Sequence, residues 1–363
     1  MFKAKFREKS CHGRIYGVIF YKMENTFHIQ WHINDRCNLR CLHCYQDIFT
    51  SERELSFPSL KDIFENVREF LEEEKKLLVV DITGGEPFLH DDFFSLIEFL
   101  ISSEVVKKVG IITNGFFLNK ENLNFLERFK KIEIKISAEG VDKEMYELFR
   151  GKGNFEKFIE TCNLLKSTDL KKTLMFTLLE SNFSEVEKLF DFIENFKFDR
   201  FVIERFIPWG RGRKIQNQVI SLKNWMETVK ILFKKTGVEE RWIEILPYRA
   251  FMVERLKGEY NLFGAPCIIG KDGCAVMPDG SVFPCRRFPL SLGNLKETQF
   301  SEIWRNSEIL KSLREKKFLK GRCKICKIKN CNGCRAIAYS LTGDFFEEDP
   351  LCFLKGMENG TYS

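Results

Sequence analysis

The chain has 363 residues, 44% of them hydrophobic, and its 58 Lys and Arg against 52 Asp and Glu leave a net charge of +6. This composition excludes a disordered chain, and so mild a charge gives no sign of nucleic-acid binding. No apolar run reaches the length of a membrane span, and the first residues lack the apolar core of a signal peptide, so we expect a cytoplasmic protein. The length predicts one large domain or two unequal ones.

Residues 1–27 include the apolar run YGVIFY and are predicted to form a strand or hairpin extension that packs on the next domain. In residues 28–212, apolar runs rich in Val, Ile and Phe alternate with segments of helical period. Six such runs joined by helices predict an α/β fold, in which right-handed crossovers curl a parallel sheet toward a barrel. Ligands of such barrels bind at the carboxyl ends of the strands, so we expect functional residues in the turns that follow them.

A triplet of cysteines follows the first of these runs. Cys37, Cys41 and Cys44 stand in C-x3-C-x2-C spacing within WHINDRCNLRCLHCY. A 4Fe-4S cube normally takes four cysteines, so a loop with three leaves one iron open to a non-protein ligand. The alternative for three close cysteines is a zinc or other structural site.

The triplet resembles the motif of the radical S-adenosylmethionine (radical SAM) enzymes. The resemblance implies a partial (β/α)6 barrel, similar to part of a TIM barrel, and a 4Fe-4S cluster whose open iron binds S-adenosylmethionine (SAM). In that family an electron from the cluster cleaves SAM to methionine and a 5'-deoxyadenosyl radical, which takes a hydrogen atom from the substrate.

The resemblance also implies which turns hold SAM. TGGEP follows the second strand, where the family binds the SAM amino group, although the motif alone fits an ordinary turn equally well. Ser137 corresponds to a hydroxyl on the SAM ribose or carboxylate. Arg150 corresponds to an arginine that pairs with the SAM carboxylate, and its alternative is a solvated surface residue. His43 lies where the family uses the backbone against adenine, and its side chain needs no acid-base role. The implied SAM-binding residues are His43, Gly84, Gly85, Glu86, Pro87, Asn114, which lies in a common turn dipeptide, Ser137 and Arg150.

Residues 213–265 are predicted to form a helical bridge that contains Trp225 and Trp242. The loop RFIPWGRG that precedes it is either a domain boundary or, as in similar relatives, part of the substrate opening. From residue 266 to 363 the chain is rich in cysteine, and MPDGSVFPC predicts a hairpin turn at Asp279–Gly280. CKICKIKNCNGC supplies two C-x2-C pairs, which alone would be typical of a zinc site.

This segment resembles the SPASM extension of peptide- and protein-modifying radical SAM enzymes, a small α+β domain with auxiliary clusters. Its eight cysteines match the number that two cubes require, which implies three 4Fe-4S clusters in the chain. By analogy the first auxiliary cluster is bound by Cys267, Cys274, Cys285 and Cys334, and the second by Cys323, Cys326, Cys331 and Cys352. The last cysteine run departs from the family, with gaps of four and two residues where five and three are usual. Of the other cysteines, Cys162 is predicted to lie in the core, and Cys11 is unassigned.

The resemblance implies an oxidoreductase-type enzyme that modifies a peptide or small protein, most plausibly by oxidative cross-linking of a ribosomally made peptide. Arg286 and Arg287 follow Cys285, where sulfatase-maturing relatives have an aspartate base, which argues against sulfatase maturation. The alternatives are tailoring of a small molecule such as a modified tetrapyrrole, and a metal-dependent binding or electron-transfer module. A flavodoxin- or ferredoxin-type reductant is the expected partner. Nucleic acid is not, because the basic residues near the late cysteines have no aromatic residues between them.

Overall fold

The computed structural model describes residues 19–20, 25–240, 242–245, 247–328 and 331–358. Within them, one curved sheet has the strand order β1-β9-β8-β7-β6-β5-β4-β3-β2-β10-β11-β12. The strands are β1 (Ile19–Phe20), β2 (Thr26–His32), β3 (Leu77–Thr83), β4 (Val106–Thr113), β5 (Ile132–Ala138), β6 (Lys171–Leu178), β7 (Arg200–Arg205), β8 (Tyr248–Arg255), β9 (Tyr260–Pro266), β10 (Gly273–Val276), β11 (Ser281–Phe283) and β12 (Gly293–Asn294).

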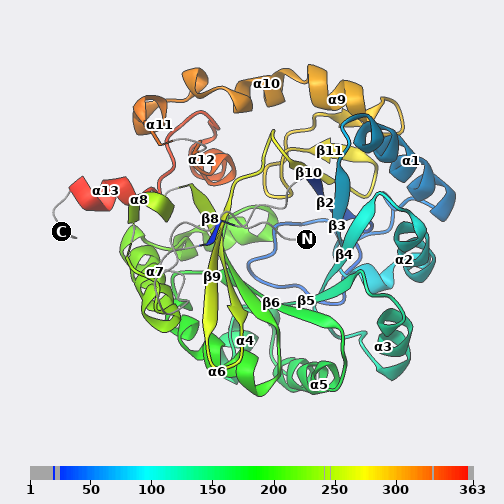
Figure 1. Ribbon diagram of the computed structural model, residues 1–363, viewed down its shortest axis with the longest axis horizontal. Helices are drawn as coiled ribbons and strands as arrows, with labels where there is room; N and C mark the ends of the chain where they lie inside the picture. The colour runs from blue at the N-terminus through cyan, green and yellow to red at the C-terminus, as the bar shows by residue number, and fades with distance from the viewer. Residues whose placement is uncertain (1–18, 21–24, 241, 246, 329–330, 359–363) are drawn as a thin grey trace, which may run out of the picture.

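The six neighbouring strands from β2 to β7 are parallel, and the helices between them cover the outer face of the sheet (Figure 1). This confirms the predicted α/β barrel, which is open rather than closed. The helical segments of this part are α1 (Phe57–Glu73), η1 (Pro87–Leu89), α2 (Phe93–Ser102), α3 (Lys120–Glu127), α4 (Lys143–Arg150), α5 (Phe155–Lys166), η2 (Phe183–Val186) and α6 (Lys188–Asn195).

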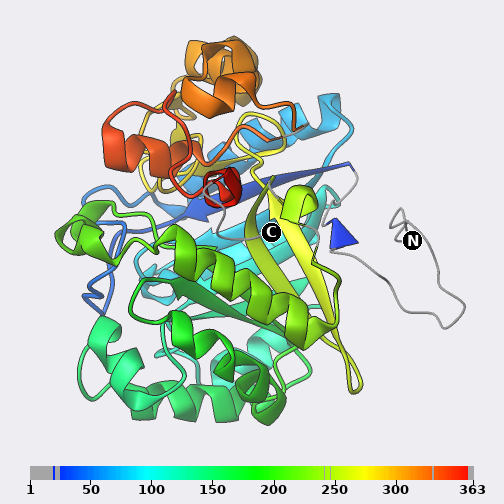
Figure 2. The same cartoon turned by 90° about the vertical axis from the view of Figure 1, so that its left-hand side faces the viewer.

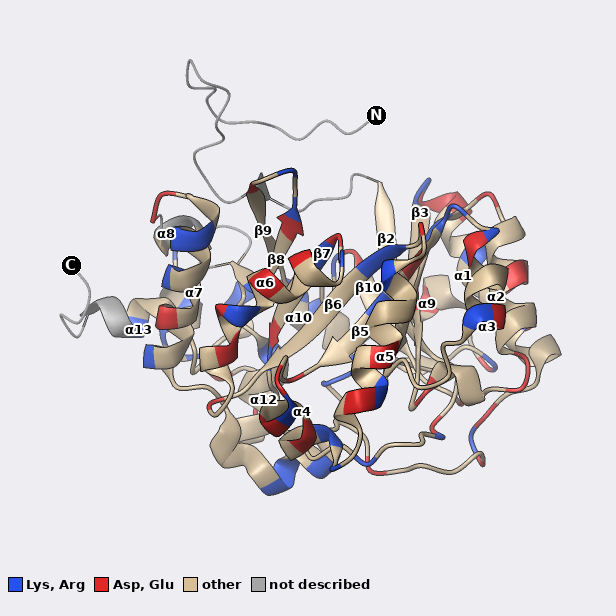
Figure 3. Cartoon of the chain, turned by 90° about the horizontal axis from the view of Figure 1, so that it is seen from below, with Lys and Arg blue, Asp and Glu red and all other residues tan. Residues whose placement is uncertain are grey.

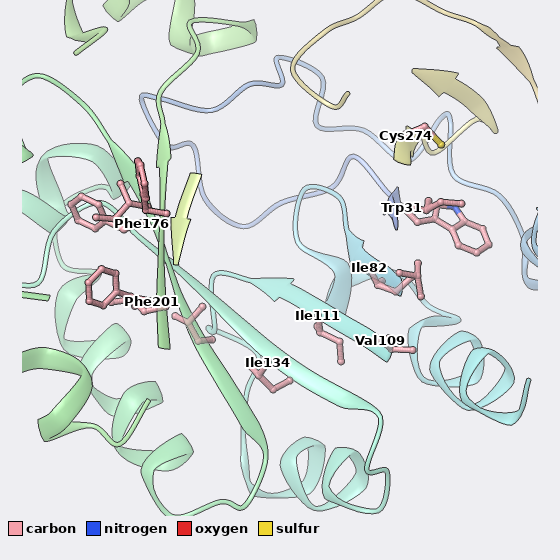
Figure 4. Packing of buried hydrophobic residues seen from close by; sticks show 14 of the residues in the cluster. Trp31, Ile82, Val109, Ile111, Ile134, Phe176, Phe201 and Cys274 are labelled. Atoms are coloured by element: carbon pink, nitrogen blue, oxygen red, sulfur yellow. The ribbon is translucent and has the colours of Figure 1, made fainter. Parts of the chain in front are cut away.

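The hydrophobic core lies mainly between the sheet and its helices (Figure 4). Strand β2 shows the cause, because its alternate residues Phe27, Ile29 and Trp31 are buried on the side that faces the helices. The Phe27 ring packs edge-on at 5.6 Å from Phe70 of α1 and at 5.7 Å from Phe300 of the C-terminal segment. The sheet is therefore anchored to both the barrel helices and the cysteine-rich segment.

The sequence predicts a helical bridge over residues 213–265, but only the first part of this segment is helical. After η3 (Gly210–Gln218), α7 (Leu222–Thr236) and α8 (Trp242–Ile245), strands β8 and β9 form an antiparallel hairpin that extends the sheet beyond β7. The run YRAFMVER favours a strand because its aromatic and β-branched residues pack well on a pleated surface. Helix α7 does form, beginning at the capping hydroxyl of Ser221 and ending at Gly237, whose φ is +67°.

The C-terminal segment is joined to the barrel through the sheet, since β10 pairs in parallel with β2. The predicted hairpin turn is confirmed: β10 and β11 are antiparallel, and Gly280 between them has φ +87°. Helices of this segment stand above the barrel and span the side between β8 and β10 (Figures 1 and 2). They are α9 (Phe300–Asn306), α10 (Glu308–Arg314), η4 (Lys316–Phe318), α11 (Gly321–Ile325), α12 (Arg335–Thr342) and α13 (Phe353–Glu358).

Most of the predicted N-terminal extension lies outside the described residues, but β1 pairs in parallel with β9. Lys and Arg are interspersed with Asp and Glu on the helices, as Figure 3 shows. None of the described helices has the length and apolar character that crossing a membrane requires.

Candidate functional site

A cavity opens at the carboxyl ends of the parallel strands, where the sequence predicts the functional residues. Its walls are the loop after β2, the carboxyl ends of β3 to β7 with some of the turns that follow them, and two arginines of the C-terminal segment. The predicted site residues that line it are Cys37, Cys41, His43, Cys44, Gly84, Gly85, Asn114, Ser137 and Arg150. Three thiols beside polar groups in one cavity fit an iron-sulfur cluster with SAM on its open iron.

The three cysteines lie on a loop that is held by its backbone. The Leu42 amide donates to the Phe149 carbonyl over 2.9 Å, and the Gly212 amide donates to the Cys44 carbonyl over 2.9 Å. Burial raises the pKa of Cys41 to about 12 and that of Cys44 to about 11. These thiols therefore keep their protons until iron displaces them.

Gly84 and Gly85 bring the turn after β3 against the chain that leads into the cysteine loop. A Cβ on Gly84 would lie 2.2 Å from Oδ1 of Asn34, and one on Gly85 would lie 2.2 Å from the Arg36 carbonyl oxygen. The sequence suggests that these glycines admit a ligand. In the structure, the lack of a side chain at these glycines also lets the chain that leads into the cysteine loop pack against them. Both glycines still line the cavity.

Glu86 does not line the cavity, although its motif predicts a contact with the SAM amino group. Its buried carboxyl accepts from the Thr113 hydroxyl over 2.7 Å and from the Asn114 amide over 2.8 Å. Burial raises the pKa of Glu86 to about 7, although these hydrogen bonds oppose the rise. Glu86 therefore ties the turn after β3 to the end of β4. Pro87, the first residue of η1, is also buried and does not line the cavity.

Glu139 lines the cavity but is not singled out by the sequence. It is fully buried, and the Arg150 guanidinium donates to it from Nε over 2.5 Å and from Nη2 over 3.0 Å. Nε2 of His43 lies 3.0 Å from Oε1 of the same carboxylate. Burial would raise the pKa of Glu139, but Arg150 and His43 outweigh it and lower the pKa to about 2. Glu139 thus orients the arginine that was predicted to bind the SAM carboxylate.

Arg286 and Arg287 bring the C-terminal segment into the cavity wall. Each donates from Nη2 to Oε2 of Glu204 over 2.8 Å, and the Arg286 guanidinium lies 5.4 Å from the centre of the Tyr45 ring. Nε of both arginines is buried and has no hydrogen-bond partner among the described residues. Burial would raise the pKa of Glu204, but the two arginines lower it. One carboxylate is therefore shared between two cations.

The Pro- and Gly-rich loop after β7 supports the cysteine loop. Gly210 has φ +53°, and a Cβ on it would lie 2.4 Å from the Tyr45 carbonyl oxygen. Nη2 of Arg211 donates to the Arg40 carbonyl over 3.2 Å. From the sequence, this loop is either a domain boundary or part of a substrate opening. In the structure it contacts and holds the chain that carries the triplet.

We expect Gly210→Ala to reduce the iron held by the triplet, because its Cβ would push the backbone at Tyr45 away. Gly237→Ala is the matched control, since Gly237 also has a positive φ but a Cβ there would meet nothing within 4 Å. The left-handed backbone costs about 1–2 kcal/mol in both variants, so only the clash differs. The measurements are iron per chain and 5'-deoxyadenosine formation under strong reductant. Equal losses in the two variants would contradict the proposed support.

The eight C-terminal cysteines fall into separate places. Four of them line a second cavity: Cys323, Cys326, Cys331 and Cys352. Burial raises the pKa of Cys267 and of Cys285, and the charge of Cys334 adds to the rise at both, so these three cysteines lie near one another. The C-x2-C-x4-C-x2-C run is therefore divided, with its last cysteine beside Cys267 and Cys285. This arrangement does not fit the single zinc site that the spacing of the run suggests.

Two cations accompany the cysteines of the second cavity, the buried Arg335 and the partly buried Arg249. Nη2 of Arg249 donates to Sγ of Cys331 over 3.0 Å, and Nη2 of Arg335 donates to Sγ of Cys323 over 3.6 Å. Donors of this kind favour thiolate over thiol and offset the negative charge of a cluster. Arg335 is one of the basic residues near the late cysteines, whereas Arg249 lies in the segment that the sequence predicts as helical.

Among the described residues, no three His, Cys, Asp or Glu side chains converge closely enough to hold a single metal ion. Cysteines of a cube bind different irons, so they need not converge in that way. Cys274, predicted with the first auxiliary cluster, lies in the hydrophobic core, where it is 5% exposed, and Cys334 belongs to the same core cluster. Cys162 is buried in α5, as predicted, and Cys11 lies outside the described residues.

Comparison with known proteins gives two family matches, the Radical SAM superfamily over residues 31–193 and the SPASM iron-sulfur cluster-binding domain over residues 267–335. AdoMet-dependent heme synthase of Methanosarcina barkeri is 28% identical over 344 residues, which cover 90% of this chain and 96% of that protein. The subtilosin biosynthesis protein AlbA of Bacillus subtilis is 28% identical over 290 residues, which cover 79% of this chain and 61% of AlbA. A solved structure of anSMEcpe with bound AdoMet shares the fold, with a TM-score of 0.69 and 22% identity over 93% of this chain and 96% of that one. The chain is therefore a radical SAM enzyme that carries a C-terminal SPASM domain, with SAM and iron-sulfur clusters as its cofactors.

Proposed function

We propose that this enzyme tailors a small molecule that carries carboxylates, such as a modified tetrapyrrole. The observation that carries the proposal is the pair of arginines in the cavity wall, Arg286 and Arg287, whose side chains are only 10% and 16% exposed and which share the single carboxylate of Glu204. Buried cations are normally paired, and guanidinium groups bind carboxylates in a fixed geometry. A substrate carboxylate would give the second cation its partner. The heme synthase relative, matched over 96% of its length, supports a tetrapyrrole.

In this proposal the chain binds and orients, and the cofactors supply the reactive chemistry. Cys37, Cys41 and Cys44 would hold a cluster that, once reduced, would supply the electron for cleavage of SAM to the radical that takes a hydrogen atom from the substrate. Arg150, held by Glu139, orients the SAM carboxylate, and Ser137 offers a hydroxyl at the end of β5. We also propose three 4Fe-4S clusters in the chain and a flavodoxin- or ferredoxin-type protein as reductant.

We expect Arg286→Gln with Arg287→Gln to abolish conversion of an iron porphyrin that bears carboxylate side chains. SAM cleavage without product should persist in the variant, because neither arginine is assigned to SAM. Mass spectrometry of the porphyrin and 5'-deoxyadenosine release measure the two steps separately. Lys271→Gln, which replaces an exposed cation outside the active cavity, is the matched control. Full conversion by the double variant would rule out the carboxylate role, whereas loss of bound iron would show that the arginines serve the neighbouring cluster.

A second candidate is maturation of a ribosomally made peptide by oxidative cross-linking, with the auxiliary clusters as electron acceptors. It is favoured by the resemblance to AlbA, a bacteriocin biosynthesis protein. The two candidates separate in one assay, in which the reduced enzyme receives either the iron porphyrin or a short peptide encoded beside its gene. A peptide product that is two hydrogens lighter, with no change in the porphyrin, would select the peptide reaction.

A further inference from the structure

Helix α11 presents an exposed apolar side chain to the solvent. Ile325, its last residue, is 77% exposed, more than any other large apolar side chain in the described part of the chain. Phe318 of the preceding η4 is 43% exposed. Lys316 joins the two elements, since its Nζ donates to the carbonyls of Cys326 over 3.1 Å and of Ile328 over 2.6 Å. Exposed apolar side chains on neighbouring elements are one mark of a surface that binds another protein.

The same surface is strongly basic. Residues 316–328 contain six Lys and Arg and no Asp or Glu, although the whole chain has a net charge of only +6. Lys317 and Lys320 form ion pairs with carboxylates outside this stretch. By contrast, Lys324 and Lys327 are exposed and form neither an ion pair nor a hydrogen bond with any other described residue. The α11 surface is defined here by four residues: Phe318, Lys324, Ile325 and Lys327.

The α11 surface adjoins the second cavity and not the active one. Cys323 lies in α11 and Cys326 directly follows it, and both line the second cavity. The buried Arg335 donates to Cys323, whereas Lys324 and Lys327 contact no thiol among the described cysteines, so these two lysines are free to meet a partner. No residue from 316 to 328 lines the active cavity, and Figure 1 shows α11 at the outer edge of the molecule. A protein bound there leaves the active cavity open to substrate.

We propose that an acidic electron-carrier protein of the flavodoxin or ferredoxin type docks on the α11 surface, beside the second auxiliary cluster. The inference rests on the proposed function, which requires such a reductant and such a cluster. Opposite charges steer the encounter, and the interfaces of electron-transfer complexes are small, so an isoleucine with a basic rim is sufficient. At each encounter the carrier gives up one electron and the enzyme takes it up, with no bond made or broken.

A rival docking surface lies over the cysteine loop, where Leu42 and Leu148 are 42% and 51% exposed. Its arginines are used by the loop itself. Nη1 of Arg40 donates to the Cys37 carbonyl over 2.6 Å, and Nη2 of Arg211 donates to the Arg40 carbonyl over 3.2 Å. A guanidinium group that is engaged in this way has fewer donors left for a partner. The greater exposure of its isoleucine and its two unpaired lysines favour the α11 surface.

The test measures binding of the anaerobic, iron-loaded enzyme to an acidic flavodoxin and to an acidic 2Fe-2S ferredoxin by calorimetry. We expect Lys324→Glu with Lys327→Glu to weaken binding of the carrier by about tenfold or more, because like charges then face each other. Ile325→Ser should weaken binding about tenfold, because burial of its side chain is lost. The affinity of the unsubstituted enzyme should also fall as the salt concentration rises.

Lys152→Glu with Lys214→Glu is the matched control. These lysines are exposed, follow the two segments that are hydrogen-bonded to the cysteine loop, and make the same change in net charge when replaced. The control should bind the carrier within about twofold of the unsubstituted enzyme. Loss of affinity in the control but not in the α11 variants would place the carrier on the cysteine loop and overturn the proposal. Unchanged binding by the α11 variants, or no binding of either carrier to the enzyme, would overturn it as well.

A second measurement separates docking from chemistry. With dithionite as the reductant, the Lys324→Glu and Lys327→Glu double variant should keep its iron and form 5'-deoxyadenosine at the normal rate, because neither residue lines the active cavity. With the carrier as the reductant, the rate should fall. Loss of iron from this variant would show that the lysines serve the cluster, and it would overturn the docking role. Failure of the proposed function would instead appear as no SAM cleavage by the unsubstituted enzyme with dithionite.

Discussion

Replacement of Cys37, Cys41 and Cys44 by alanine is expected to abolish SAM cleavage and to remove about four of about twelve irons. The three thiols line the active cavity together, and no other described cysteine outside the C-terminal segment lines it. Without them, the chain has no ligands for the cluster whose open iron binds SAM. The auxiliary cysteines are carried by separate elements and should keep their irons. The measurements are 5'-deoxyadenosine formation under strong reductant and iron per chain.

Cys162→Ala is the control for the triplet variant. Cys162 is completely buried in α5 and belongs to the hydrophobic core, so its replacement removes a thiol without touching any cluster. We expect a loss of about 1 kcal/mol in the free energy of unfolding and unchanged iron content. Formation of 5'-deoxyadenosine by the triplet variant would contradict the assignment of Cys37, Cys41 and Cys44 as ligands of the SAM-binding cluster.

Arg150→Met is expected to destabilise the protein and to abolish SAM cleavage as well. The Glu139 carboxylate would remain fully buried with His43 as its remaining ionisable neighbour. Removing one partner of a buried ion pair costs about 3–5 kcal/mol, because the other charge is left uncompensated. Urea unfolding under anaerobic conditions measures the free energy of unfolding, and equilibrium dialysis with labelled SAM measures binding.

The double variant Arg150→Met with Glu139→Gln separates the two roles of the arginine. Because it leaves no unpaired carboxylate, most of the lost stability should return. SAM binding should stay weak, since no guanidinium remains to hold the SAM carboxylate. If the double variant bound and cleaved SAM normally, Arg150 would be only a structural partner of Glu139.

Local patterns in the sequence predict the barrel and the triplet well. The apolar runs of β2 to β7 are separated by segments of helical period, and parallel strands place all their following turns at one end of the sheet. Cys37, Ser137 and Arg150 therefore come together in one cavity although more than 100 residues separate the first from the last. A sequence that predicts consecutive parallel strands therefore also predicts that the residues after these strands share one cavity.

Other features depend on contacts that no local pattern encodes. Glu139 lies two residues after Ser137, and a carboxylate just after a buried strand is a signal that could have marked it. Its pairing with Arg150, however, depends on how α4 packs. Residues 248–255 and 260–266 are rich in aromatic and β-branched residues, which favour strands, but reading 213–265 as one helical segment overlooks this signal. The direction of Cys274 depends on the register of β10 against β2, which spacing between cysteines cannot reveal.

The pairing of β10 with β2 also determines when the sheet can be completed during synthesis of the chain. Strand β2 leads into the triplet and leaves the ribosome early, yet its second neighbour is synthesised more than 200 residues later. Until then, one edge of β2 presents unpaired backbone groups, a feature that finished proteins usually protect. The radical centre and the auxiliary clusters are thus not independent modules, because the newly made barrel reaches its final edge only when the SPASM segment has emerged.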